Sequence, residues 1–197
     1  MKSWRPFRLT IVCIAAMLVI GLATPMAMAD DDEKIVFTVD VAEDLNKFVP
    51  GPPMVGGVPQ RGSFFITEGN IYPGGTIPGD GSTFDPTDPN GPKPIGRWFC
   101  RGTHLVAGDQ IPGTREPWVY TSQLYLLPND EKSIDTSGLE QTAPVVRTVT
   151  GGTGTFKDVL GVQKQEFLGA FNTTGGANLR VTFELRKAAN KEGSDSR

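Results

Sequence analysis

Hydrophobic and polar residues alternate in short runs along most of the chain. In the clearest run, Asn178 to Lys187, one face carries Leu179, Val181, Phe183 and Leu185. Such alternation is typical of an antiparallel strand with one buried face. Seven other runs have the same character: Lys34 to Val41, Gly62 to Gly69, Gly96 to Leu105, Trp118 to Leu127, Ser133 to Gln141, Val145 to Thr150 and Asp158 to Phe171. Eight short strands predict an all-β sandwich or closed barrel.

Two segments interrupt this pattern. Val41 to Phe48 has the best helical periodicity of the chain beyond its N-terminus and predicts a helix of about two turns. The segment from Tyr72 through Gly96 contains six glycines and six prolines, which predict a long loop. A connection of that length in a compact domain is typically a lid over a site or a disordered segment, and the sequence leaves both open.

The N-terminus has the three zones of a secretion signal. A basic start (Lys2, Arg5 and Arg8) precedes an apolar run from Leu9 to Leu22 and the small-residue motif Ala27-Met28-Ala29. We therefore predict a signal peptide over residues 1–29, cleavage before Asp30, and a secreted or periplasmic protein without a membrane anchor. The remaining chain of about 170 residues is enough for one domain, here residues 30–187. Residues 188–197 are small and polar and predict a disordered tail.

Charge and cysteine content exclude several classes of function. The net charge of −3 becomes more negative once the basic signal is removed, and no basic cluster follows, so nucleic acid is not an expected partner. Cys13 leaves with the signal, so that Cys100 has no partner for an internal disulfide. A single histidine and a single mature cysteine predict no zinc site. Four loop residues carry the oxygen ligands that calcium prefers, but their spacing does not fit an EF-hand and turn formation explains them equally well: Asp80, Asp85, Asp88 and Asn90.

A glycine-rich turn joins two predicted strands in the segment Val146 to Gly161. Its centre reads Gly151, Gly152, Thr153, Gly154, Thr155 and Phe156. Glycine permits positive φ and close backbone approach. Because both flanks are strands and no Gly-Lys-Ser/Thr follows, a phosphate-binding loop is disfavoured. We interpret the segment as a structural turn.

This Gly-Gly-Thr-Gly-x-Phe turn closely resembles that of the allene oxide cyclase and dirigent barrel families. Residues 96–102 look like a central strand of the bacterial secreted branch, and residues 178–185 look like the family's closing strand. The resemblance covers roughly Lys34 to Lys187. It implies an eight-stranded antiparallel β-barrel with a cavity at one end, assembled as trimers in plant members. Those members cyclise a reactive oxylipin or guide the coupling of phenoxy radicals.

The resemblance therefore implies a secreted barrel that binds a hydrophobic or aromatic small molecule and steers a cyclisation or coupling without a cofactor. It brings no catalytic residue across, because the turn is structural. The alternative is a non-catalytic ligand carrier or cell-surface interaction protein on the same barrel, because the sequence shows no convincing triad, metal cluster or carboxylate pair. Both hypotheses stay open, as does assembly into a dimer or trimer.

Strand alternation selects candidate ligand-binding residues. On the strand beginning at Gly96, the face with Trp98, Cys100 and His104 opposes Arg97 and Arg101, which are costly to bury unpaired, so we expect the Trp98 face inside. The strands 118–127 and 158–171 are partly apolar on both faces, so that periodicity cannot orient them, and their outer faces would suit subunit contacts. The predicted ligand-binding residues are Trp98, Cys100, His104 and Tyr125.

Three residues are weak candidates for acid or base catalysis. His104 is the chain's one imidazole, although a partly exposed hydrogen-bonding role at a strand end explains it as well. Glu140 and Glu166 fall on predicted strands, and an inward carboxylate would have a raised pKa. Solvated glutamates on the barrel surface are the alternative. Cys100 is expected to be a buried core residue rather than a nucleophile.

Overall fold

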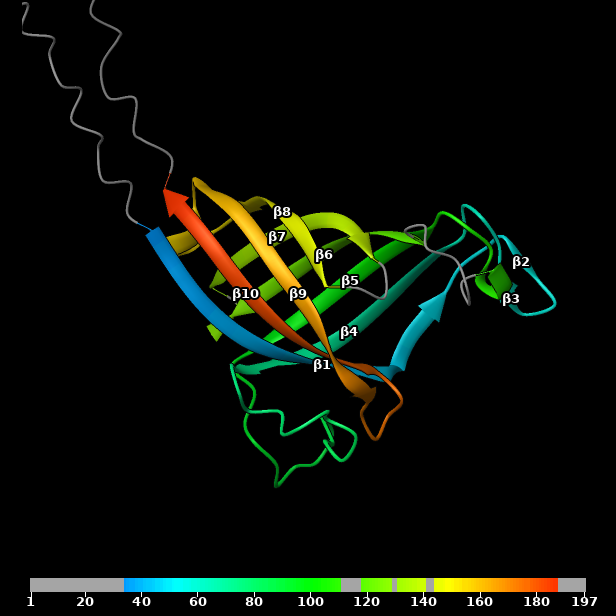
Figure 1. The fold of residues 1–197 in the computed structure, drawn as a ribbon, viewed down its shortest axis with the longest axis horizontal. Helices are drawn as coiled ribbons and strands as arrows, with labels where there is room; N and C mark the ends of the chain where they lie inside the picture. Colours follow the sequence, from blue (N-terminus) through cyan, green and yellow to red (C-terminus); the bar gives the residue numbers. More distant parts are fainter. Residues whose placement is uncertain (1–33, 111–117, 129–130, 141–143, 188–197) are drawn as a thin grey trace, which may run out of the picture. The chain divides into compact units, whose positions relative to one another are not determined.

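A computed structural model describes residues 34–110, 118–128, 131–140 and 144–187 of the chain (Figure 1). In these residues eight strands close into an antiparallel barrel with the order β1-β10-β9-β8-β7-β6-β5-β4. They are β1 (Lys34–Pro50), β4 (Phe64–Pro73), β5 (Gly96–His104), β6 (Val119–Leu127), β7 (Lys132–Glu140), β8 (Val145–Gly152), β9 (Val159–Phe171) and β10 (Ala177–Lys187). The predicted all-β barrel is thus confirmed.

Small elements complete the described chain. A hairpin of β2 (Met54–Val55) and β3 (Val58–Pro59) follows β1. Short 3-10 turns are η1 (Gly108–Gln110) and η3 (Gly154–Phe156). No helix in the described ranges is long and apolar enough to span a membrane. The predicted signal peptide and the predicted disordered tail lie outside the described residues.

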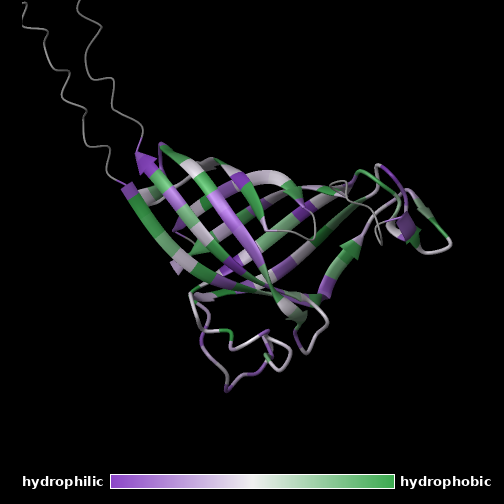
Figure 2. Cartoon of the chain, viewed as in Figure 1, coloured by the Kyte–Doolittle hydropathy of each residue, from purple (hydrophilic) through white to green (hydrophobic). Residues whose placement is uncertain are grey.

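Alternation along each strand fills the barrel interior. Figure 2 shows polar and apolar residues succeeding one another along the strands. On β10, Leu179, Val181, Phe183 and Leu185 are all buried in the main core cluster, as their pattern predicts. The Trp98 face of β5 is buried too. Because each inward residue is flanked by outward ones, a single sheet encloses the core on one side and meets solvent on the other.

The prediction of a helix over Val41 to Phe48 is wrong, because these residues continue β1. Residues Val39 to Asp44 pair with residues Glu68 to Pro73 of β4, and the register shifts between Asp44 and Val49. That irregularity breaks the period-two pattern that a strand normally shows, which left helical spacing as the better match. The consequence is functional, because a strand sends alternate residues of this segment into the barrel.

The long loop between β4 and β5 is neither the lid nor the disordered segment that the sequence left open. Residues Ile77 and Phe84 are buried against Ala42 and Tyr72 on the outer side of the barrel wall. The backbone N–H of Ile77 donates to Asp40 (2.9 Å), and the Asn178 side chain donates to the Gly81 carbonyl (3.0 Å). A small second core therefore holds the loop on the outside.

The glycine-rich turn closes one end of the barrel. Thr153 accepts a hydrogen bond from the Ser133 backbone N–H (2.9 Å) through its hydroxyl and returns one through its own N–H (3.0 Å). Gly154 has a φ of +60°, and a Cβ on Gly152 would lie 2.6 Å from the Phe156 carbonyl oxygen. The turn brings the Phe156 ring to 5.7 Å from that of Phe37 in the core. Glycine at these two positions thus permits the close approach.

Candidate functional site

The barrel interior has an apolar part and a polar part. The apolar part contains Trp98, Ile134, Phe183 and Leu185 together with other members of the main core. The polar part is a set of hydrogen-bonding side chains on the inward faces of β6, β7, β8 and β9, which we call the interior polar cluster. Its members are Thr121, Gln123, Tyr125, Thr136, Glu140, Arg147, Gln163 and Gln165.

Glu140 is the carboxylate of this cluster. Its Oε1 accepts hydrogen bonds from the Thr121 hydroxyl (3.2 Å) and the Gln123 amide (3.1 Å), and it lies 3.7 Å from Arg147 Nη1. Burial raises the pKa of Glu140, while the nearby Arg147 charge and the two hydrogen bonds oppose the rise. The side chain is still 18% exposed, so that solvent reaches this end of the interior.

Arg147 lies next to Glu140, and its side chain is 0% exposed. It starts on β8, passes Gly138 on β7 and reaches β6, where its Nη2 donates to the carbonyl (2.9 Å) and the hydroxyl of Thr121. A Cβ on Gly138 would lie 3.1 Å from Arg147 Cγ, so glycine leaves room for the arginine to cross. Among the described residues, Nε and Nη1 of Arg147 have no hydrogen-bond partner.

Gln123 and Gln163 connect Glu140 by hydrogen bonds to the hydroxyl groups of Tyr125 and Thr136. Gln163 donates to the Tyr125 hydroxyl (2.9 Å) and accepts from the Thr136 hydroxyl (2.6 Å), and Tyr125 donates to Gln123 (2.6 Å). Gln123 in turn donates to Gln165 (2.9 Å). Such connected buried hydrogen bonds fix the positions of their members. The cluster therefore presents Glu140 in one orientation.

Glu43 adds a second carboxylate to the same region from β1. It accepts hydrogen bonds from the Thr67 hydroxyl (2.7 Å) and the Ala177 backbone N–H (2.9 Å). Its charge is close enough to raise the pKa of both Glu140 and Cys100. Sequence reasoning missed Glu43 because it falls in the segment predicted as a helix.

The predicted ligand-binding residues all lie on inward faces, but in different surroundings. Trp98 and Tyr125 pair across β5 and β6 in the apolar part, although the Tyr125 hydroxyl reaches the cluster. Cys100 is buried beside them, and burial raises the pKa of its thiol well above the usual value, so it is a poor nucleophile. Whether these residues bind a ligand stays a prediction.

His104 is not among the residues that hydrogen bonds join in the interior polar cluster. It is 8% exposed, its ring is 5.7 Å from that of Phe65 in an edge contact, and its Nδ1 has no hydrogen-bond partner in the described chain. Burial lowers the pKa of His104, which favours the neutral imidazole. His104 and Glu140 both lie opposite Val119, on β5 and β7, and no hydrogen bond or ion pair joins them among the described residues.

The other sequence candidates lie outside the barrel. Glu166 is exposed on β9, on the face opposite Gln163 and Gln165. The aspartates of the long loop each accept a hydrogen bond from a backbone N–H two residues on: Ser82 for Asp80, Thr87 for Asp85 and Asn90 for Asp88. These are turn-forming contacts. Within the described residues, no group of three or more His, Cys, Asp or Glu side chains is placed to hold a metal ion.

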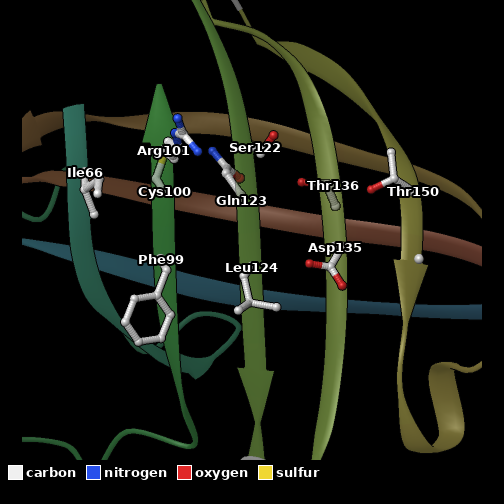
Figure 3. A pocket seen from close by; sticks show the side chains of 11 residues that line it. Ile66, Phe99, Cys100, Arg101, Ser122, Gln123, Leu124, Asp135, Thr136 and Thr150 are labelled. Carbon is white, nitrogen blue, oxygen red and sulfur yellow. The ribbon is translucent and has the colours of Figure 1, made fainter. Parts of the chain in front are cut away.

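A groove lies on the outer wall, bordered mainly by outward residues and also by Gln123 and Thr136 of the interior polar cluster. It crosses β4 to β8, and Figure 3 shows Ile66, Phe99 and Leu124 along it with Arg101 and Asp135. These residues alternate with the inward ones on the same strands, so the groove lies on the opposite side of the wall from Glu140. Burial raises the pKa of Asp135. Apolar outer residues fit the predicted subunit contact, which stays a prediction.

Comparisons with known proteins bear on the fold. No protein-family model matches the chain, and no curated protein matches its sequence significantly. The solved structure of the pterocarpan synthase dirigent protein PsPTS1 has a TM-score of 0.54 and 14% identity over 79% of this chain and 97% of that chain. The related GePTS1 has a TM-score of 0.53 and 11% identity over 84% and 96%. The chain has a dirigent-like barrel fold.

A third similar structure is the Diels Alderase AbmU from Streptomyces koyangensis, with a TM-score of 0.49 and 15% identity over 85% of this chain and 75% of that chain. The dirigent-like fold that the glycine-rich turn implied is confirmed by the PsPTS1 and GePTS1 structures. The allene oxide cyclase relationship and the secreted bacterial branch stay predictions.

Arg147 is the main residue of the site that sequence reasoning missed. The expectation that arginines face solvent does not hold for Arg147. Val145, Arg147 and Val149 share one buried face of β8. The available signal was Gly138 inside a predicted strand, since an isolated strand glycine marks a place where another group approaches closely.

Proposed function

We propose that this dirigent-like barrel binds a small organic molecule at the Glu140 end of its interior and steers a cyclisation or coupling of that molecule. The observation that carries the proposal is the interior polar cluster, in which a partly exposed carboxylate is fixed beside a fully buried arginine. Buried charges and amides are costly in a barrel that needs only a core. A ligand site gives such a cluster a role.

Glu140 is suited to move a proton. Burial raises the pKa of Glu140 above its ordinary value of 4.5, which favours the protonated carboxyl group that can donate a proton. Its described contacts all engage Oε1, and none of them engages Oε2. A fixed carboxyl beside a bound molecule favours one reactive conformer, and such preorganisation can supply several kcal/mol, about 7 to 11 in favourable cases.

The surroundings of Glu140 suit a ligand with a hydrophobic or aromatic body. Val119 lies opposite Glu140 in the β6–β7 ladder and opposite His104 in the β5–β6 ladder. Phe65 packs between His104 and Phe48, with ring centroids 5.7 and 5.3 Å away. Apolar side chains near a few fixed polar groups are typical of small-molecule sites. The signal peptide proposed for residues 1–29 would place this function outside the cytoplasm.

The decisive experiment identifies what the native protein holds and what it does. The protein would be purified from its own cells, the organic extract analysed by mass spectrometry, and each compound found returned to ligand-free protein. An enzyme yields a product of altered structure or stereochemistry, whereas a carrier returns the compound unchanged.

Two matched variants link the result to the site. Glu140→Gln should abolish conversion and weaken binding, while Glu166→Gln, the same change on the exposed face of β9, should leave both intact. If conversion persists in Glu140→Gln, the proposed role of Glu140 is wrong. If the compound is unchanged by the native protein, the barrel is a carrier.

A further inference from the structure

Two phenylalanines are exposed at the rim of the barrel, where β9 continues past its ladder with β8. Phe167 and Phe171 are 39% and 62% exposed, and their ring centroids are 5.3 Å apart. The described β8–β9 ladder reaches Gln165, a member of the interior polar cluster, and stops before both phenylalanines. Adjoining exposed apolar side chains, unlike single ones, typically mark a site of interaction.

A bulge in β9 keeps both rings on the inner face of the sheet. Phe167 lies opposite Leu179 of β10 and Phe171 lies opposite Ala177, with a register shift between the two pairs. Leu179 belongs to the main core and Ala177 packs against it, and residues directly opposite in an antiparallel ladder share a face. Leu168, within the bulge, packs outward against the second core. Bulges at barrel rims commonly re-aim side chains toward a site.

Glu43 reaches the same rim from β1. Its half-buried carboxylate accepts a hydrogen bond from the backbone N–H of Ala177 (2.9 Å), the residue opposite Phe171. On its other side, Glu43 lies opposite Gly69 of β4. Because alanine and glycine are the smallest residues, little side-chain bulk flanks the carboxylate. We call Glu43, Phe167 and Phe171 the rim site.

The charge of Glu43 has no counter-ion in the described part of the chain. Its hydrogen-bond donors are neutral groups, the Thr67 hydroxyl (2.7 Å) and the Ala177 N–H, and no lysine or arginine there forms an ion pair with it. Arg147, the buried cation of the interior, lies beside Glu140 instead. A charge withdrawn from water is favourable only when it is paired. The rim site therefore suits a ligand that brings a positive charge.

We propose that the rim site binds the positively charged group of an organic cation between the Glu43 carboxylate and the rings of Phe167 and Phe171. This inference rests on the proposed function and names its substrate class: a cation with a hydrophobic body. The carboxylate attracts the charge, and the negative faces of aromatic rings attract it as well. The net charge of −3 of the chain favours the approach of a cation in the same way.

The hydrogen bonds of Glu43 indicate which kind of cation fits. Each carboxylate oxygen already accepts a hydrogen bond, Oε1 from Thr67 and Oε2 from Ala177. A quaternary ammonium group has no N–H to donate, and aromatic side chains are its common recognition partners in proteins. We therefore expect a quaternary ammonium to bind better than a primary amine of the same body.

The test uses three probes of one shape and different charge. They are (2-naphthylmethyl)trimethylammonium, 2-neopentylnaphthalene, in which carbon replaces the nitrogen, and 2,2-dimethyl-3-(2-naphthyl)propanoate, in which a carboxylate replaces one methyl group. Equilibrium dialysis against the full-length wild-type protein measures their dissociation constants. The cation should bind at least about 10-fold more tightly than the neutral probe, and the anion should bind most weakly.

Matched variants assign the preference to the rim site. Glu43→Gln keeps the size of the side chain and its hydrogen-bond acceptor, and it should bring the cation to within about 2-fold of the neutral probe. Glu166→Gln, the same change on the exposed face of β9, should keep the preference. Phe171→Leu should weaken binding of the cation by about 3-fold relative to the neutral probe, whereas Phe99→Leu in the outer groove should not.

A readout on the wild-type protein covers the case in which a variant fails to fold. The N-methyl proton resonance of the bound cation should move upfield, because ring currents shield protons that lie over an aromatic face. Sedimentation velocity on wild type and Phe171→Leu tests whether the exposed rings contact a second copy of the chain instead.

Several results would overturn the inference. Equal binding of the cationic and neutral probes, or a preference that Glu43→Gln retains, would do so while the proposed function survives, because the probes still bind. Loss of self-association in Phe171→Leu with unchanged cation binding would assign the rings to a subunit contact. A copurified compound without a positive charge would also contradict a cation site. If no probe binds and no compound copurifies, the proposed function fails as well.

Discussion

Two ion pairs of this protein differ in how completely their hydrogen bonds are made. On the outer wall, Asp40 accepts from Arg180 Nε (2.9 Å) and Nη2 (3.2 Å) and from the backbone N–H of Ile77. In the interior, Glu140 and Arg147 are 3.7 Å apart, and two nitrogens of Arg147 have no partner in the described chain. Both carboxylate oxygens of Asp40 thus accept hydrogen bonds, whereas only part of the hydrogen-bonding capacity of Arg147 is used.

The surroundings of the two pairs explain the difference. Asp40 is 0% exposed but Arg180 is 37% exposed, so only one of the two charges loses its water. The hydrogen bonds that Arg180 donates to Asp40 raise the pKa of Arg180. This pair joins β1, β10 and the long loop, and its role is structural. Among the described residues, no hydrogen bond of the interior pair reaches a loop, and the unpartnered Nε and Nη1 of Arg147 are compatible with a ligand.

Removing the outer carboxylate should have the largest effect. Asp40→Ala leaves the Ile77 N–H unpaired and detaches Arg180 from the loop. We expect a loss of about 2–3 kcal/mol in the free energy of unfolding, below the full cost of breaking a buried pair because Arg180 reaches solvent. Urea denaturation measures the loss, and hydrogen exchange should show the loop amides opening first. Glu184→Ala, at the exposed Lys164 pair, is the control and should change little. An equal loss in both variants would contradict the structural role.

Replacing the interior pair with apolar residues should have the opposite sign. The double variant Arg147→Met with Glu140→Leu removes both charges together, so no buried charge is left alone. We expect unchanged stability or a gain of about 1–2 kcal/mol. Thermal and urea denaturation measure the change. A large loss would show that the interior pair is structural, like the outer one.

The pH dependence of stability should report on Glu140. Because burial raises the folded-state pKa of Glu140 above its ordinary value of 4.5, the folded state holds this proton more tightly than the unfolded state. Its stabilising contribution is present below that value and is lost as pH rises through the folded pKa. Wild-type protein should therefore lose stability relative to Glu140→Gln on going from acid to neutral pH. A difference that does not vary with pH would refute the burial of this carboxyl group.

The smallest expected effect belongs to His104. Its folded pKa lies below 6.5 because of burial, so its contribution is present above that value and is lost as pH falls through the folded pKa. Since the chain has one histidine, His104→Phe should remove the histidine-linked loss of stability on acidification. Denaturation at a series of pH values checks this, and an unchanged slope would show that His104 does not titrate with folding.

Local pattern predicted much of the barrel but little of the site. The alternation on β10 and the Trp98 face of β5 identified the inward residues correctly, because one buried face imposes a period of two on any such strand. The sequence could not decide which faces of β6 and β9 point inward, because apolar residues occupy both sides of each strand. The structure places Gln123 and Gln163 inside, where each finds partners on another strand.

The errors have one physical origin. The register shift after Asp44 interrupts the strand pattern of β1, so that this segment was predicted as a helix and Glu43 was not recognised as a site residue. The long loop packs outside because Asp40, a residue on another strand, accepts its Ile77 N–H. In both cases the deciding partner is distant in sequence, so the local pattern carries no record of it.

Local sequence patterns were enough to predict an all-β chain with an apolar core and a structural glycine turn, because alternation and positive-φ glycines are local properties. The entry of Arg147 into the interior could be seen only in the folded barrel. Its burial depends on Gly138 leaving space and on Thr121 and Glu140 supplying partners from two other strands. A charged side chain is stable inside a barrel only where other strands supply partners, and the pairing of β8 with β7 and of β7 with β6 places those partners around Arg147.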